Sequence, residues 1–110
     1  MKLAMVIYSN DPETVWNAFR LGVHALKGGD AVSIFLLGRG VEAEKLSEAR
    51  FPVVATMQEY IAAGGALLAC GTCLKLREQA GSELCPVSTL ADLHVLITNS
   101  DKVWTLARLF

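Results

Sequence analysis

Short apolar runs alternate along the chain with longer segments in which apolar residues recur at helical spacing. Each run is too short for a helix and is bounded by polar residues or glycines, so it predicts a buried strand. Pro86 weakens the fourth of these strands, because proline cannot donate to a sheet ladder. The strands are expected at residues 3–8, 31–37, 66–69, 84–87 and 102–106.

The segments between the strands carry helix signals. Asp11 can cap the free amides of the first helix, Pro12 suits its first position, and Gly28 ends it. In the helix expected over 52–63, Val54, Met57 and Ile61 are expected to lie on one side. The Glu-rich stretch 41–49 predicts a short helix or an ordered loop. Further helices are expected over 52–63, 72–80 and from Ser88 to about 99.

Strands that alternate with helices at this spacing imply right-handed crossovers and a mainly parallel sheet. The predicted fold class is α/β, a three-layer α/β/α arrangement around about five strands. With 110 residues, the chain forms a single domain over 1–110. Parallel strands end at one edge of their sheet, where ligands and reactive groups gather. Segments 9–12, 38–40 and 70–73 are expected to meet there.

The composition adds expectations about partners and compartment. Apolar residues make up 53% of the chain, and the mean hydropathy is +0.40. A domain of this size cannot hide so much apolar surface in one core, so we expect a homo-oligomer. Trp104 and Tyr60 are expected contributors to its interface.

Charge and segment length exclude other partners. Ten basic and eleven acidic residues are interspersed, which predicts neither a nucleic-acid nor a membrane partner. No stretch approaches the roughly 18 apolar residues of a membrane span. The start of the chain has too short an apolar run for an export signal, so a cytoplasmic location is expected.

The candidate chemistry lies in Cys70-Gly-Thr-Cys73. Cys70 follows a predicted strand, and Cys73 falls in the first turn of the next predicted helix. Free amides and the dipole at a helix start favour a thiolate, so either thiol is expected to have a lowered pKa. Arg77, one helical turn beyond Cys73, adds positive charge. Two thiols at this spacing can close a disulfide or pass sulfur between them.

Simpler interpretations of the cysteines stay open. A cysteine at a strand end is often a small buried apolar residue. A structural zinc ion needs four ligands, and both His24 and His94 lie within predicted helices at no metal-like spacing from the cysteines, so no metal is expected. A thioredoxin assignment fits poorly, because that fold carries its cysteine pair near the chain start, after a tryptophan, whereas here the pair lies two-thirds along the chain. Cys85, next to Pro86, is expected to be structural or a third relay thiol.

Two further residues are candidates for substrate binding at the same edge. Arg39, between Gly38 and Gly40, can hold an anion beside the thiols or lie in a solvated turn. Asn10 can border the thiol pocket. The loop that contains Asn10 lacks the glycine-rich turn of a nucleotide site, and no organic cofactor is expected.

Residues 67–77, Leu-Leu-Ala-Cys-Gly-Thr-Cys-Leu-Lys-Leu-Arg, resemble the central segment of DsrE-like proteins. This family includes the TusD sulfur-relay subunits and the YchN-type proteins. Residues 88–93 and 101–104 are similar to its last helix and strand, and the resemblance runs the length of the chain. In it, Cys70 matches the persulfide-carrying cysteine and Arg77 matches the following arginine. Cys73 matches a second cysteine found in some branches.

The resemblance implies a sulfurtransferase-like sulfur carrier. The Cys70 thiolate would take the outer sulfur of a donor persulfide, and Arg77 would stabilise the anionic sulfur. Cys73 would remove the persulfide by attacking it, which releases sulfide and leaves a disulfide. The implied partners are sulfur donor and acceptor proteins or small thiols. Two other functions fit the residues: a non-catalytic oligomeric binding or regulatory protein of this fold, and a thiol–disulfide redox protein.

Overall fold

The computed structural model describes residues 1–107, and five parallel strands form its central sheet. The strand order is β4-β3-β2-β1-β5, so each new strand joins one side or the other of the β1–β2 pair. All the carboxyl ends of the strands therefore lie at one edge of the sheet. The strands are β1 (Lys2–Ile7), β2 (Ala31–Leu36), β3 (Ala66–Cys70), β4 (Val87–Ser88) and β5 (Lys102–Leu106).

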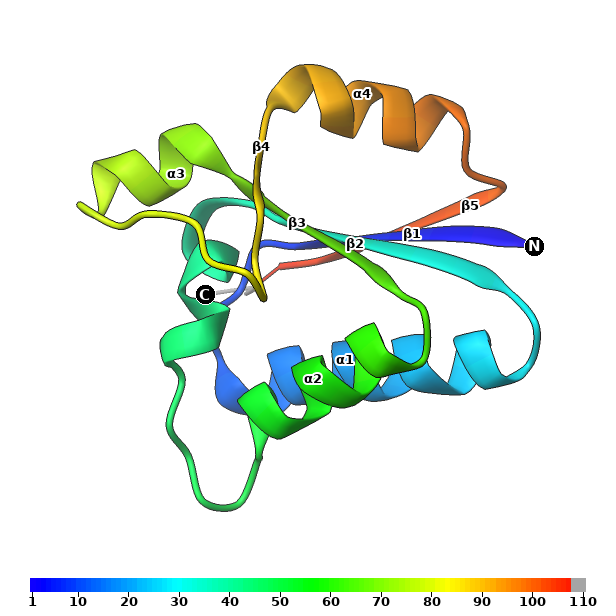
Figure 1. Ribbon diagram of the computed structural model, residues 1–110, viewed down its shortest axis with the longest axis horizontal. Coiled ribbons are helices and arrows are strands. Elements are labelled where there is room, and N and C mark those ends of the chain that lie inside the picture. The colour runs from blue at the N-terminus through cyan, green and yellow to red at the C-terminus, as the bar shows by residue number, and fades with distance from the viewer. Residues whose placement is uncertain (108–110) are drawn as a thin grey trace.

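Helices cover both faces of the sheet (Figure 1). Helices α1 and α2 pack side by side on one face, and α3 and α4 lie on the other. The predicted three-layer α/β/α fold is confirmed. Their bounds, with the 3-10 helix η1, are α1 (Pro12–Lys27), η1 (Gly38–Lys45), α2 (Val53–Ala62), α3 (Gly71–Leu76) and α4 (Leu90–Thr98).

Helix α1 begins and ends as its local sequence predicts. The Asp11 side chain accepts the Thr14 backbone N–H at 3.0 Å, and Pro12 occupies the first helical position. Gly28 caps the other end through its own N–H. The buried residues of this helix include Val15 and Phe19, which face the sheet. Because β1 leads straight into α1, this start lies at the carboxyl edge of the sheet.

Two expectations about α2 are wrong: that Tyr60 contributes to a subunit interface, and that Val54, Met57 and Ile61 form its apolar side. The Tyr60 side chain is fully buried, and its hydroxyl lies 2.6 Å from the Ala66 carbonyl oxygen and 3.1 Å from that of Val32. The buried side of α2 therefore runs through Val53, Met57 and Tyr60, whereas Ile61 is exposed. Tyr60 is a core residue and cannot contribute to a subunit interface.

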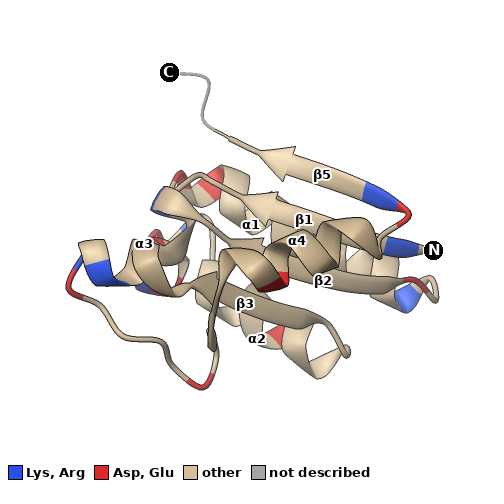
Figure 2. Ribbon diagram, turned by 90° about the horizontal axis from the view of Figure 1, so that it is seen from above, with Lys and Arg blue, Asp and Glu red and all other residues tan. Residues whose placement is uncertain are grey.

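Other differences lie at the ends of elements. Helix α3 ends at Leu76 rather than near residue 80, because the chain turns back toward β4 and Glu78 adopts a left-handed φ of 53°. Thr89, rather than Ser88, caps α4 by accepting the Asp92 N–H at 3.1 Å. Within residues 1–107, no helix is both long enough and apolar enough to cross a bilayer. Basic and acidic positions are interspersed around the molecule (Figure 2).

Candidate functional site

The carboxyl edge of the sheet brings three separate segments together. β1 ends before the loop 8–11, β2 ends before η1, and β3 ends at Cys70. The register pairs Ile7 with Leu36 and Leu36 with Ala69, so the three strands end side by side. This arrangement gathers the predicted site segments at one place, as expected for a parallel sheet.

Two free thiols lie at this edge, and they differ in exposure. Cys70 is the last residue of β3 and is only 3% exposed. Cys73, on the first turn of α3, is half-buried, and the Cys70 side chain lies near enough to influence its pKa. The Gly38 backbone N–H donates to the Cys73 sulfur at 3.2 Å. The two sulfurs therefore form an inner and an outer position at the same site.

Glycine makes the close approach of η1 possible. Gly38 adopts a left-handed φ of 56°, a conformation that glycine accepts readily. A side chain there would also press against the Tyr8 ring. At Gly40, a Cβ atom would overlap the backbone carbonyl of Ile7. These two positions let η1 begin directly against the end of β1 and aim a backbone N–H at Cys73.

A polar network joins the same three segments. The Arg77 Nε donates to Glu42 at 2.8 Å, and the Asn10 side-chain amide donates to the other Glu42 oxygen at 3.3 Å. Arg77 also donates to the Cys73 carbonyl oxygen at 3.1 Å. The Arg77 side chain thus fixes the backbone that carries Cys73. Sequence reasoning missed Glu42, whose one signal was its place in the Glu-rich stretch just after the 38–40 turn.

The pKa values of the site reflect burial and the network. Burial and the neighbouring Cys70 thiol raise the pKa of Cys73 above its ordinary value, although the Gly38 N–H and the Arg77 charge act in the opposite direction. The expectation of a lowered pKa is therefore wrong for Cys73. Helix α3 has only six residues, too few for a strong dipole to offset burial. The Arg77 hydrogen bond lowers the pKa of Glu42.

The remaining candidates take different positions. Arg39 is exposed at the start of η1, and its charge contributes weakly to the lowered pKa of Glu42. Cys85 is buried, and burial followed by the nearby Glu44 charge raises its pKa to about 12. Such a thiol is poorly reactive at neutral pH. Among residues 1–107, no three His, Cys, Asp or Glu side chains gather to hold a metal ion.

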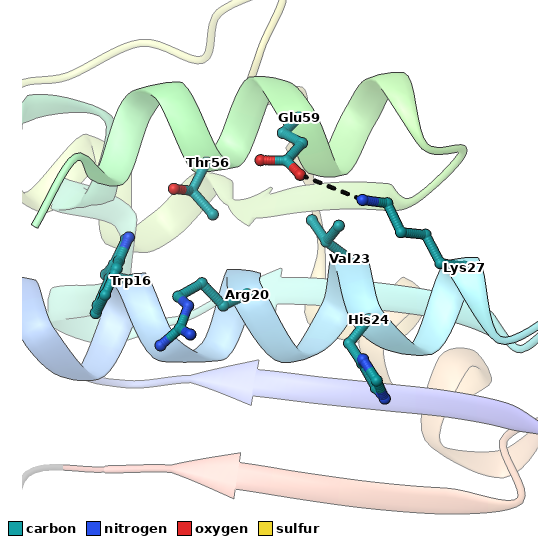
Figure 3. A pocket seen from close by; sticks show the side chains of 7 residues that line it. All are labelled: Trp16, Arg20, Val23, His24, Lys27, Thr56 and Glu59. Carbon is teal, nitrogen blue, oxygen red and sulfur yellow. Dashed lines mark ion pairs between the residues drawn. The ribbon is translucent and has the colours of Figure 1, made fainter.

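A separate groove of about 360 Å³ lies between α1 and α2 (Figure 3). Its charged side chains already have partners within the molecule. Lys27 reaches across to Glu59 at 3.7 Å, and Arg20 stacks on the Trp16 ring at 4.4 Å while donating to Asn17. The groove contains neither of the paired cysteines. The thiol edge is therefore the better candidate for chemistry.

Comparison with known proteins identifies the family and the fold of this chain. A family model described as the DsrE/DsrF-like family matches residues 1–106. Among solved structures, the YchN protein from E. coli superposes with a TM-score of 0.80 at 18% sequence identity, covering 96% of this chain and 100% of its own. A search of curated proteins found no match. At this identity, the structural likeness supports the fold alone.

Proposed function

Because this chain belongs to the DsrE/DsrF-like family, we propose that it is a sulfur carrier that accepts sulfur as a cysteine persulfide and passes it on. The observation that carries the proposal is the pairing of two free thiols at the sheet edge, with a Gly38 N–H directed at one of them. Cys70 carries the sulfur as a persulfide. Cys73 is the second thiol that exchanges sulfur at this site, and Arg77 holds the backbone of Cys73 in position. Asn10 acts through Glu42, and the exposed Arg39 meets anionic groups of the arriving partner.

The burial of Cys70 supports its role as the residue that stores the persulfide sulfur. A persulfide is readily lost to thiols in solution, and a sulfur enclosed by the core is shielded from them. Arg77 is a positioning residue in this proposal, because its guanidinium binds the Cys73 carbonyl and Glu42. The reaction requires no metal or organic cofactor, since sulfur passes between thiols of the donor, the carrier and the acceptor. The donor and the acceptor are proteins or small thiols.

The test is intact-mass spectrometry after treatment with a persulfide donor and removal of that donor. The wild type should retain one or more added sulfur masses, about 32 Da each, that a reductant removes. Cys70→Ser should not retain them. Cys85→Ser is the matched control and should behave as the wild type. Equal retention by the wild type and Cys70→Ser would refute the role of Cys70.

A thiol–disulfide redox function is the second candidate, favoured by two free thiols three residues apart at the end of β3 and on the first turn of α3. It requires a reversible disulfide and no capacity to hold sulfur. Quantitative disulfide formation with no added sulfur mass would favour it. Either chemistry suits a cytoplasmic location, where free thiols persist.

We also propose that the protein is a homo-oligomer. Helix α4 buries only Leu93 among its residues, while Leu90 and Val95 are 61% and 56% exposed. The edge strand β5 exposes Val103 and Trp104. A second copy covering α4 and β5 would remove this apolar surface from water.

A further inference from the structure

The exposure of the two thiols suggests different tasks for them. Cys70 is 3% exposed, and it is the last residue of β3, directly before the first turn of α3. Cys73 is partly exposed at the surface of the same turn. A donor that carries its sulfur on a protein must bring two sulfur atoms into contact, in line with the bond that breaks. Only the outer thiol meets that requirement without movement of the chain.

We propose that Cys73 is the receiving thiol, which takes sulfur from the donor and passes it inward to Cys70. This inference rests on the proposed sulfur-carrier function and assigns a route within it. The Gly38 N–H already directed at the Cys73 sulfur stabilises the negative charge that sulfur bears during each step. Arg77 holds the Cys73 backbone so that its sulfur keeps this position.

The first step transfers sulfur without net oxidation. The Cys73 thiolate attacks the terminal sulfur of the donor persulfide, the donor S–S bond breaks, and the donor leaves as a thiolate. The product is a Cys73 persulfide. No external oxidant or reductant is consumed, because one S–S bond forms as another breaks.

The second step exchanges sulfur between neighbours. The Cys70 sulfur attacks the outer sulfur of the Cys73 persulfide, the Cys73 S–S bond breaks, and a Cys70 persulfide forms. The Cys70 proton passes to the released Cys73 sulfur, the neighbouring thiol at this edge. Delivery to an acceptor reverses the route. The same proximity allows attack on the inner sulfur, which would release hydrosulfide and leave a Cys70–Cys73 disulfide.

The experiment compares a bulky donor with a small one. Serum albumin carrying a persulfide on its free cysteine is the bulky donor, and inorganic tetrasulfide is the small donor. Sulfur uptake is measured by intact mass at short times in the wild type, Cys70→Ser, Cys73→Ser and Cys85→Ser. From albumin, Cys73→Ser should load at least about tenfold more slowly than the wild type. Cys70→Ser should load at a rate comparable to the wild type and lose the sulfur faster.

The small donor and a labelling measurement separate the outcomes. Tetrasulfide should still load Cys73→Ser, which shows that this variant is folded and that Cys70 can hold sulfur. Equal uptake from albumin by Cys73→Ser and the wild type would overturn the route while leaving the carrier function intact. A wild type that loads from neither donor would overturn the carrier function and the route together. In the wild type, a pulse of iodoacetamide should label Cys73 before Cys70, and the reverse order would refute the route.

Discussion

The Gly38 backbone N–H donates to the Cys73 sulfur at 3.2 Å, across a separation of 35 residues in the sequence. This contact joins the end of β2 to the first turn of α3. It exists because Gly38 adopts a left-handed φ of 56° two residues after the end of β2. The chemistry of Cys73 therefore depends on the backbone of another segment, and substitutions on either side of the contact test it.

The first prediction concerns Gly38. Gly38→Ala should destabilise the fold by about 1 kcal/mol or more, because its φ is left-handed and its Cβ would lie 2.9 Å from the Tyr8 ring. It should also change the rate at which Cys73 reacts with iodoacetamide. Gly29→Ala is the matched control, with a φ of 96° but no neighbour within 4 Å. Urea unfolding measures the change in stability, and iodoacetamide labelling measures the change in Cys73 reactivity. Equal labelling rates in both variants would show that the Gly38 contact does not affect the reactivity of Cys73.

The second prediction is a pH profile. The alkylation rate of Cys73 should rise with pH and reach half its maximum above the ordinary thiol value of 9.0, because the raised pKa keeps the thiol neutral. Cys70→Ala removes one cause of the raised pKa, so the midpoint should move down. Cys85→Ala should leave it unchanged. Peptide mass spectrometry after brief iodoacetamide exposure measures the profile, and a wild-type midpoint below 9.0 would contradict the prediction.

The third prediction concerns the ion pair between Glu42 and Arg77, at 2.8 Å. Glu42→Gln should cost less than about 1 kcal/mol of stability, since the pair is partly exposed. Because the pKa of Glu42 is lowered, the contribution of the pair is present above the unfolded-state value and is lost as pH falls through the folded-state value. Stability against pH in acid should therefore be flatter in the variant.

The same substitution has a second readout at the thiol. Without the carboxylate, the Arg77 charge is no longer neutralised, and the pKa of Cys73 should fall. Glu44→Gln, on the same helix η1 but bonded to Ser82, is the control and should not alter Cys73. If both variants shift the Cys73 profile equally, the effect belongs to the overall charge and not to Arg77.

The fourth prediction is assembly. Light scattering at micromolar concentration should give at least twice the monomer mass of 11.9 kDa. Burial is worth roughly 25 cal/mol per Å² before association costs, and a standard interface takes about 800 Å² from each partner. Ile97→Glu on α4 should weaken the assembly. Ile61→Glu on α2 is the control, because the two side chains are 41% and 39% exposed on opposite faces of the sheet. A monomeric wild type would refute the proposal.

The local sequence was enough to predict the succession of strands and helices along the chain. Strand β5 lies over Lys102–Leu106, as the apolar pattern predicts, and β1 differs by one residue at each end. The start of α1 was equally readable, because a cap and a first-turn proline act on the nearest amides. Strands buried on both faces require continuous apolar runs, which makes them visible without a structure. The meeting of the three site segments followed from the parallel sheet alone.

The partners of each side chain, its burial and its pKa depend on packing between segments that are far apart in the sequence. The pairing of Glu42 with Arg77 spans 35 residues, and nothing in either local sequence selects that partner. Tyr60 is buried because Gly65 leaves room for its ring, since a Cβ atom there would overlap it. The pKa of Cys73 follows from a balance of burial against nearby donors, which depends on atoms from three segments. The alternation of strands and helices was enough to predict that both thiols lie at the carboxyl edge of the sheet. Only the packing of η1 and α3 over that edge decided that Cys70 lies inside and Cys73 outside.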